Sequence, residues 1–151
     1  MPQQLTAEDA RQSLTAHLAE KGRQVYLKYG PEIGWNQLLQ ILEDRTVTRY
    51  PCEIVFDAQQ LLPDEVAVAL ARSERPEDGF TIFVHPYFLL DPARVPCLVL
   101  YQMVVVNYGE FATADDAETF GAAALGILKE EYYTHLCTMA EEISGDVVAQ
   151  F

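Results

Sequence analysis

The sequence is poor in basic residues, histidine and cysteine. Its 151 residues include 3 His, 3 Cys and 10 Lys plus Arg against 23 Asp plus Glu, for a formal net charge of −13 at pH 7. Proteins that bind nucleic acid or anionic membranes normally carry a surplus of Lys and Arg, which displaces counterions. We therefore expect no nucleic-acid or membrane partner. The charge fits a soluble acidic protein, and it leaves room for a basic protein partner.

The few cysteines exclude two kinds of site. Cys52, Cys97 and Cys137 are odd in number, far apart, and each preceded by an apolar residue. This spacing provides neither a disulfide framework nor a Cys-x-x-Cys metal clip. We expect reduced thiols in the protein interior.

Several segments and motifs are also missing. No apolar run reaches the roughly 18 to 20 residues of a membrane span, and the first residues lack the basic start and apolar core of a signal peptide. The expected compartment is therefore the cytoplasm. The sequence has no Gly-rich phosphate loop and no Gly-x-Ser-x-Gly motif. No repeat or linker divides the chain, so residues 1–151 are predicted to form one domain.

The amino-terminal third is helical in pattern. Thr6 is a suitable N-cap, and apolar residues at helical spacing follow it up to Gly30-Pro31, which predicts a helix over residues 7–29. A second helix is predicted over residues 32–43. We expect the two helices to pack together as a helical hairpin within residues 1–48.

The middle of the chain predicts a small sheet. Residues 52–57 and 80–85 alternate in the manner of strands. Residues 66–71 contain good helix formers, yet Val66, Val68 and Leu70 alternate with alanines, and this period of two favours a strand. The turn-rich residues 73–79 predict an antiparallel hairpin between the second and third strands.

The last third predicts helices again. Residues 95–107 are apolar on nearly every side and are followed by Gly109, which predicts a central buried helix. Thr113 caps the next helix, which is expected to reach about Lys129. Further helical pieces should reach Ile143 in a carboxy-terminal extension, residues 129–151. The predicted fold class is therefore α+β.

This order of elements resembles the small zincin metallopeptidases of the gluzincin type. The resemblance covers about residues 52–128, and its most specific part is Asp116-Ala-Glu-Thr-Phe-Gly121. In that family the buried helix carries His-Glu-x-x-His, and the following helix supplies a third zinc ligand. The resemblance implies a zincin-like core in which the strand ending at His85 forms the edge of the substrate cleft.

The catalytic motif of that family is altered here. Aligned on the turn at residues 107–109, it falls on Tyr101, Gln102 and Val105. Valine cannot bind a metal, tyrosine with a pKa near ~10 is a poor ligand at neutral pH, and an amide cannot act as a general base. Only the third-ligand position keeps a carboxylate, Asp116, with Glu118 close by. The resemblance thus implies the fold without the activity, with no catalytic residue and no zinc.

Three hypotheses follow. The first is an inactive metallopeptidase-like protein kept as a binding or regulatory module, which holds a peptide or protein partner by strand addition along Phe80–His85. Its vestigial cleft would comprise His85, Tyr101, Gln102, Val105, Asp116 and Glu118. The second is a metal-dependent hydrolase with a site relocated to His85, Asp116 and Glu118. The third is a structural protein that oligomerises through its amino-terminal hairpin, although the sequence predicts no particular oligomeric state.

Overall fold

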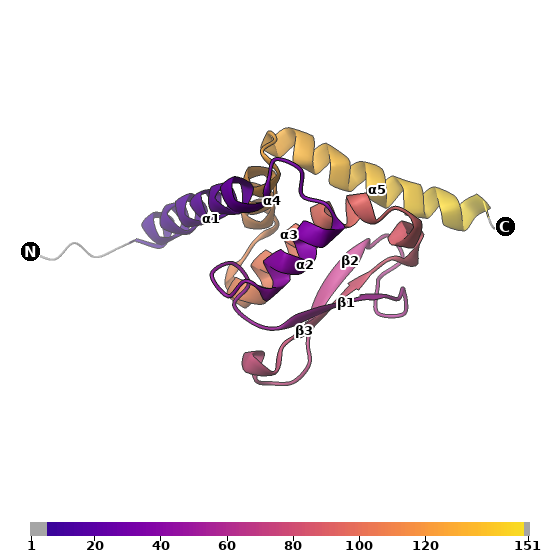
Figure 1. Ribbon diagram of the computed structural model, residues 1–151, viewed down its shortest axis with the longest axis horizontal. Helices are drawn as coiled ribbons and strands as arrows, with labels where there is room; N and C mark the ends of the chain where they lie inside the picture. Colours follow the sequence, from indigo (N-terminus) through magenta and orange to yellow (C-terminus); the bar gives the residue numbers. More distant parts are fainter. Residues whose placement is uncertain (1–5, 150–151) are drawn as a thin grey trace, which may run out of the picture.

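The computed structural model describes residues 6–149, with side chains described for residues 6–145. Within this range the fold is α+β, with five α-helices and three strands joined by loops and short 3₁₀ turns (Figure 1). The helices are α1 (Ala7–Tyr29), α2 (Trp35–Glu43), α3 (Val95–Tyr108), α4 (Ala114–Leu125) and α5 (Lys129–Ala149). The strands are β1 (Cys52–Phe56), β2 (Ala67–Ala71) and β3 (Phe80–Val84).

The three strands form one mixed sheet in the order β1-β3-β2. β3 pairs with β2 antiparallel, as expected from the turn between them, and with β1 in parallel. Ile82 therefore lies between Ile54 on one side and Ala69 on the other. The strand prediction for residues 66–71 is confirmed, because the period of two outweighed the helix propensity of the alanines.

The position of β3 corrects one expectation. β3 is the central strand, so the prediction that Phe80–His85 forms a free edge is wrong. Both sides of its backbone are hydrogen-bonded to neighbouring strands, which leaves no row of donors and acceptors for an added strand. The outer strands are β1 and β2.

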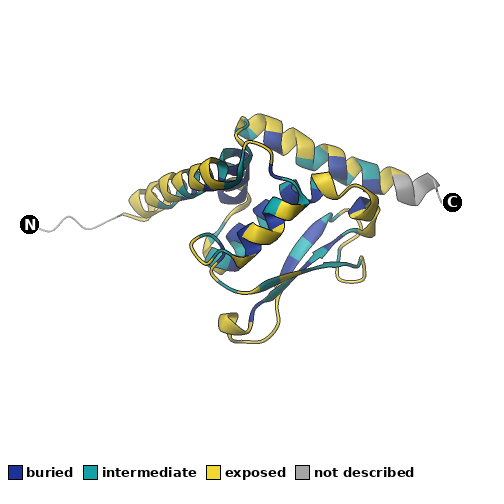
Figure 2. Cartoon of the chain, viewed as in Figure 1, coloured by how far each residue is buried: buried dark blue, intermediate teal, exposed yellow. Residues whose placement is uncertain are grey.

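Helix α3 is the core of the fold. Eight of its 14 residues are buried, and it packs against β2, β3, α4 and α5. Pro96 lies in the first turn, and Gly109 ends the helix with φ +60°, a conformation that favours glycine. The predicted central buried helix is confirmed. Figure 2 shows that α5 covers one side of this core, with its inner face buried and its outer face exposed.

The side of β2 that carries alanines faces this core. Ala67 and Ala69 are 4% and 8% exposed, whereas Leu70 on the other side is 39% exposed. Since α3 packs directly against β2, only small side chains fit between them. The two faces separate as the alternation predicts.

Helix α1 packs mainly along α4 and has few contacts with α2. The expected amino-terminal helical hairpin is therefore wrong. A Cβ atom added at Gly22 would lie 2.6 Å from both the backbone oxygen of Phe120 and the Cβ of Ala123. Small residues at this crossing let the two backbones approach closely, so the apolar stripe of α1, with Leu18 and Val25 buried, is covered by α4.

Helix boundaries follow local sequence at several ends. Thr6 and Thr113 each form a capping box, as their positions predict. Helix α4 ends at Leu125 rather than near Lys129, because Gly126 adopts a left-handed conformation with φ +69°. α5 is one continuous helix to Ala149, beyond the expected end near Ile143. The last residues of the predicted extension, 150–151, lie outside the described residues.

The cysteines are free and half-buried. Burial raises the pKa of Cys52 to about 11 and that of Cys97 to about 12, so both thiols stay protonated at neutral pH. Among the described residues, no helix combines the length and apolarity that crossing a lipid bilayer requires.

Candidate functional site

A groove of about 360 Å³ lies between β2, α3, α4 and α5. Its walls are mostly apolar, with contributions from Val66, Leu98, Leu136 and Ala140. The polar residues that line it are Asp64, Glu65, Tyr101, Gln102, Glu118 and Tyr133. The described lining includes three carboxylates and no Lys, Arg or His. The groove is therefore an apolar site with negative charge.

Two of the predicted cleft residues enter the groove from α3. Leu98, Tyr101 and Gln102 line it and are spaced three and four residues apart, so they share one face of the helix. Val105 lies four residues beyond Tyr101 on the same face and is half-buried, but it is not part of the groove lining. Tyr101, Gln102 and Val105 therefore share one face of α3, and two of the three line the groove.

Gln102 is fully engaged with the strand β2. Its Oε1 accepts a hydrogen bond from the Ala69 N–H at 3.1 Å, and its Nε2 donates to the Ala67 carbonyl at 3.3 Å. These backbone groups point away from β3, toward the side where a further strand would pair. The side chain of Gln102 therefore takes the place of a pairing strand at this point of the edge.

Glu118 on α4 is half-buried in the groove and lacks a hydrogen bond or ion pair with any residue that the structure describes. Tyr101 is its neighbour: burial, and then the negative charge of Glu118, raise the pKa of the Tyr101 hydroxyl. The phenol is therefore protonated at neutral pH, and its hydroxyl group can donate or accept a hydrogen bond. Glu118 and Tyr101 thus leave a carboxylate and a hydroxyl in the groove lining without a hydrogen-bond partner among the described residues.

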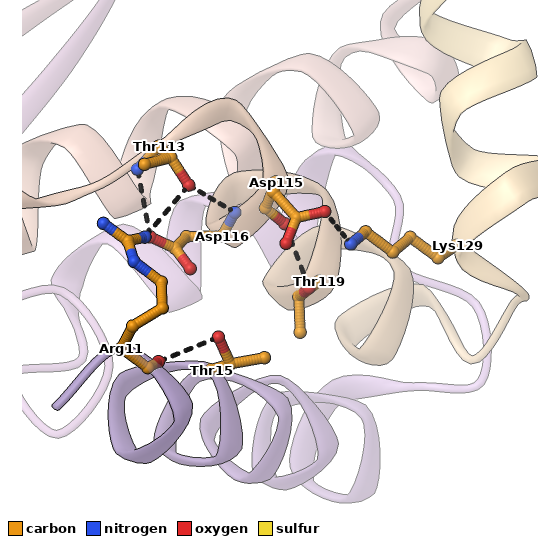
Figure 3. A network of polar contacts seen from close by, with 7 residues as sticks. All are labelled: Arg11, Thr15, Thr113, Asp115, Asp116, Thr119 and Lys129. Carbon is orange, nitrogen blue, oxygen red and sulfur yellow. Dashed lines mark hydrogen bonds and ion pairs between the residues drawn. The ribbon is translucent and has the colours of Figure 1, made fainter. Parts of the chain in front are cut away.

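Asp116 caps the start of α4. It is fully buried, and its Oδ2 accepts hydrogen bonds from the Thr113 N–H at 3.0 Å and from Nη1 of Arg11 at 2.9 Å. Figure 3 shows Arg11 and Thr113 converging on this carboxylate at the start of α4. Asp116 does not line the groove, so its predicted place in a shared cleft with Glu118 is wrong. The capping box explains the displacement, because it turns the carboxylate back toward the amino end of its own helix.

His85 is also outside the groove. It follows β3, and its Nδ1 accepts a hydrogen bond from the Tyr87 N–H at 3.1 Å. Within residues 6–145, no three His, Cys, Asp or Glu side chains gather in a way that could hold a metal ion. The relocated metal site of His85, Asp116 and Glu118 is thus contradicted by their separate positions.

No protein-family model, curated protein or solved structure matches the chain. The similarity to zincins therefore stays a prediction from the residues at 52–128.

The sequence did not indicate the fourth wall of the groove. Tyr133, Leu136, Cys137 and Ala140 line it from α5, and Tyr133 is 55% exposed at its rim. Their spacing of three and four residues marks a shared helix face, but this pattern is shared by most surface helices. Only the packing of α5 beside β2 and α3 shows that this face borders a groove.

Proposed function

We propose that this protein is a non-enzymatic binding module, whose groove takes a Lys or Arg side chain presented by an apolar segment of a protein partner. Its framework would be zincin-like, with the metal chemistry lost. The observation that carries the proposal is Glu118, a half-buried carboxylate without an ion pair among the described residues, in a groove with apolar walls.

A basic side chain fits both properties of the groove. The aliphatic stem of Lys or Arg packs on apolar surface while its charged head reaches a polar partner. Leu98, Leu136 and Ala140 supply that surface, and Glu118 and the Tyr101 hydroxyl supply acceptors. A charge-assisted hydrogen bond to a partly desolvated carboxylate is stronger than one between neutral groups. The net charge of −13 attracts such a partner from a distance.

The engagement of Gln102 favours recognition of a side chain over strand addition. Ala67 and Ala69 already share hydrogen bonds with its amide, so a peptide strand would have to displace Gln102 before pairing there. The same amide cannot accept a proton from water, which supports a role in binding rather than in hydrolysis.

The test uses two short labelled peptides that differ only at a central residue, lysine in one and norleucine in the other, both flanked by leucine and alanine. Fluorescence anisotropy should show saturable binding of the lysine peptide, weaker at high salt. Glu118→Gln should weaken it about tenfold, as expected for loss of one charge-assisted contact. Glu141→Gln removes the same charge from an exposed position of α5 outside the groove lining and should change binding less than about twofold.

Two results would contradict the proposal. One is equal binding of the lysine and norleucine peptides, since a cation would then contribute nothing. The other is an affinity that Glu118→Gln leaves unchanged. Absence of binding by either peptide would also count against it, because the probe carries the chemistry that the groove is proposed to recognise.

A further inference from the structure

The basic residues of this protein divide into two sets. Of the 10 Lys and Arg residues, seven form ion pairs with carboxylates: Arg11, Arg23, Lys28, Arg72, Arg75, Arg94 and Lys129. The other three, Lys21, Arg45 and Arg49, have no carboxylate partner within the part of the chain that the structure describes. This is unexpected in a chain with 23 acidic residues.

These three residues line a single pocket of about 380 Å³. Lys21 comes from α1, and Arg45 and Arg49 come from the loop that follows α2. Asn107 and Tyr108 close the pocket from the end of α3. The described lining contains no carboxylate. The pocket therefore gathers the unpaired cations of an acidic protein in one place, on a different set of residues from the groove at Glu118.

The loop that carries the two arginines is held in position. Asn107 Oδ1 accepts a hydrogen bond from the Arg49 N–H at 2.8 Å, and its Nδ2 donates to the Val47 carbonyl at 2.8 Å. Asp44 Oδ1 accepts from the Thr46 N–H at 3.0 Å. The backbone that carries the two arginines is thus held in place before any ligand binds.

Many donors of these cations are still available. The guanidinium of Arg49 has no hydrogen bond with the described residues and lies 5.6 Å from the centroid of the Tyr108 ring. Arg45 uses only Nη1, which donates to two backbone carbonyls. Lys21 makes one long hydrogen bond, of 3.3 Å, to the Thr46 carbonyl. Arg45 and Arg49 are exposed, so a ligand can reach them.

Gathering like charges raises the electrostatic free energy of the empty pocket, and no protein carboxylate in its lining offsets this cost. We propose that the pocket binds a compact small-molecule anion with at least two negative charges, a phosphate ester or a polycarboxylate. The planar fork of a guanidinium group can donate two parallel hydrogen bonds to two oxygens of either a phosphate or a carboxylate. Long polyanions such as nucleic acid do not fit, because the remaining surface of a protein with charge −13 repels them.

The experiment is calorimetric titration of the full-length protein at low ionic strength with pyrophosphate, phosphoserine and citrate. At least one should bind saturably at one site, and more weakly as salt is added. Tighter binding of the two phosphate compounds would assign the phosphate class, and tighter binding of citrate would assign the polycarboxylate class.

Arg49→Gln is the informative variant because its guanidinium has no hydrogen bond that the fold depends on. It should weaken binding about tenfold. Arg23→Gln removes the same charge from an exposed position of α1 outside the pocket lining and should change affinity less than about twofold. The proposal fails if none of the three anions binds saturably, or if the two variants weaken binding equally. Circular dichroism of both variants verifies that the fold is unchanged.

Discussion

Gln102 and Ala69 join the central helix to an outer strand: the Gln102 Oε1 accepts a hydrogen bond from the Ala69 N–H at 3.1 Å. The same amide donates to the Ala67 carbonyl at 3.3 Å. In the predicted resemblance to zincins, this position would correspond to the general base. Here its side chain forms hydrogen bonds with the backbone of β2. A carboxylate could accept from the Ala69 N–H but could not donate to the Ala67 carbonyl.

Gln102→Glu should therefore destabilise the protein. The carboxylate keeps an acceptor for Ala69 but places a negative oxygen against the Ala67 carbonyl, at a cost of about 1 to 3 kcal/mol in the free energy of unfolding. Urea denaturation measures this. Gln40→Glu makes the same change on an exposed position of α2 and should stay within about 0.5 kcal/mol of the parent. Equal stability of the two variants would contradict the role of Gln102.

Gly121→Ala should destabilise the contact between α4 and α5. A Cβ atom at Gly121 would lie 2.3 Å from Cζ of Tyr132, a fully buried ring whose hydroxyl donates to the Cys97 carbonyl at 2.6 Å. The ring cannot move without losing that bond, so we expect a loss of about 1 to 3 kcal/mol. Gly145→Ala is the control, because among the described residues no heavy atom outside the adjacent helix backbone lies within 4 Å of its added Cβ, and it should stabilise α5 by up to about 1 kcal/mol. Thermal unfolding distinguishes them.

Asp44 should make stability depend on acid pH. Hydrogen bonds from Lys28, then from Thr46 and Tyr29, hold the pKa of its carboxyl well below the usual range. A lowered folded-state pKa means that the stabilisation is present above the ordinary aspartate pKa of about 3.9 and is lost as the pH falls toward the folded-state value. Asp44→Asn should cost about 1 to 2 kcal/mol at pH 7, after allowance for the exposed Lys28 partner. The difference between the two proteins should shrink below about pH 4. A difference that is constant from neutral pH to about pH 3 would show that the charge of Asp44 is unimportant.

Asp116→Asn separates a capping role from a metal-binding role. The capping box and the bond from Arg11 predict a loss of about 1 to 2 kcal/mol in unfolding free energy. Asp115→Asn loses an exposed ion pair with Lys129 and should change stability by less than about 0.5 kcal/mol. Zinc content, measured by elemental analysis, should be the same in both variants and the parent. Zinc lost only from Asp116→Asn would restore Asp116 as a ligand.

A gain of metal binding tests the zincin-like framework. Tyr101 and Val105 are one helical turn apart on the face that includes the groove residue Leu98, and Glu118 is a neighbour of Tyr101 in the groove lining. The double variant Tyr101→His, Val105→His should therefore bind zinc with a carboxylate as third ligand, while the parent binds none in stoichiometric amount. Cobalt substitution gives a visible absorption band when the site forms. A double variant that folds but takes up no more metal than the parent would argue against the framework.

Much of the secondary structure was predictable because its causes are local. The caps at Thr6 and Thr113, the breaks at Gly30 and Gly109, and the alternation at residues 66–71 each depend on neighbours a few residues away. Tyr101 and Gln102, which line the groove from α3, were singled out by the resemblance to the zincin motif, and their spacing from Leu98 places them on one helix face. Glu118 follows Asp116 by two residues on α4 and lines the groove. The carboxylate of Asp116 instead accepts a hydrogen bond at the start of its own helix.

The sequence by itself thus determined the α+β class, the central buried helix, and the absence of the zinc-binding motif at Tyr101, Gln102 and Val105. Only the tertiary structure decided that β3 is central, that α1 packs on α4, and that Lys21, Arg45 and Arg49 meet in one pocket. These outcomes depend on which surfaces fit together across long separations in the chain. Local propensity does not say which helix packs on α1 or which strand lies in the middle of the sheet. The close approach at Gly22 fixes the first, and strand pairing on both sides of β3 fixes the second.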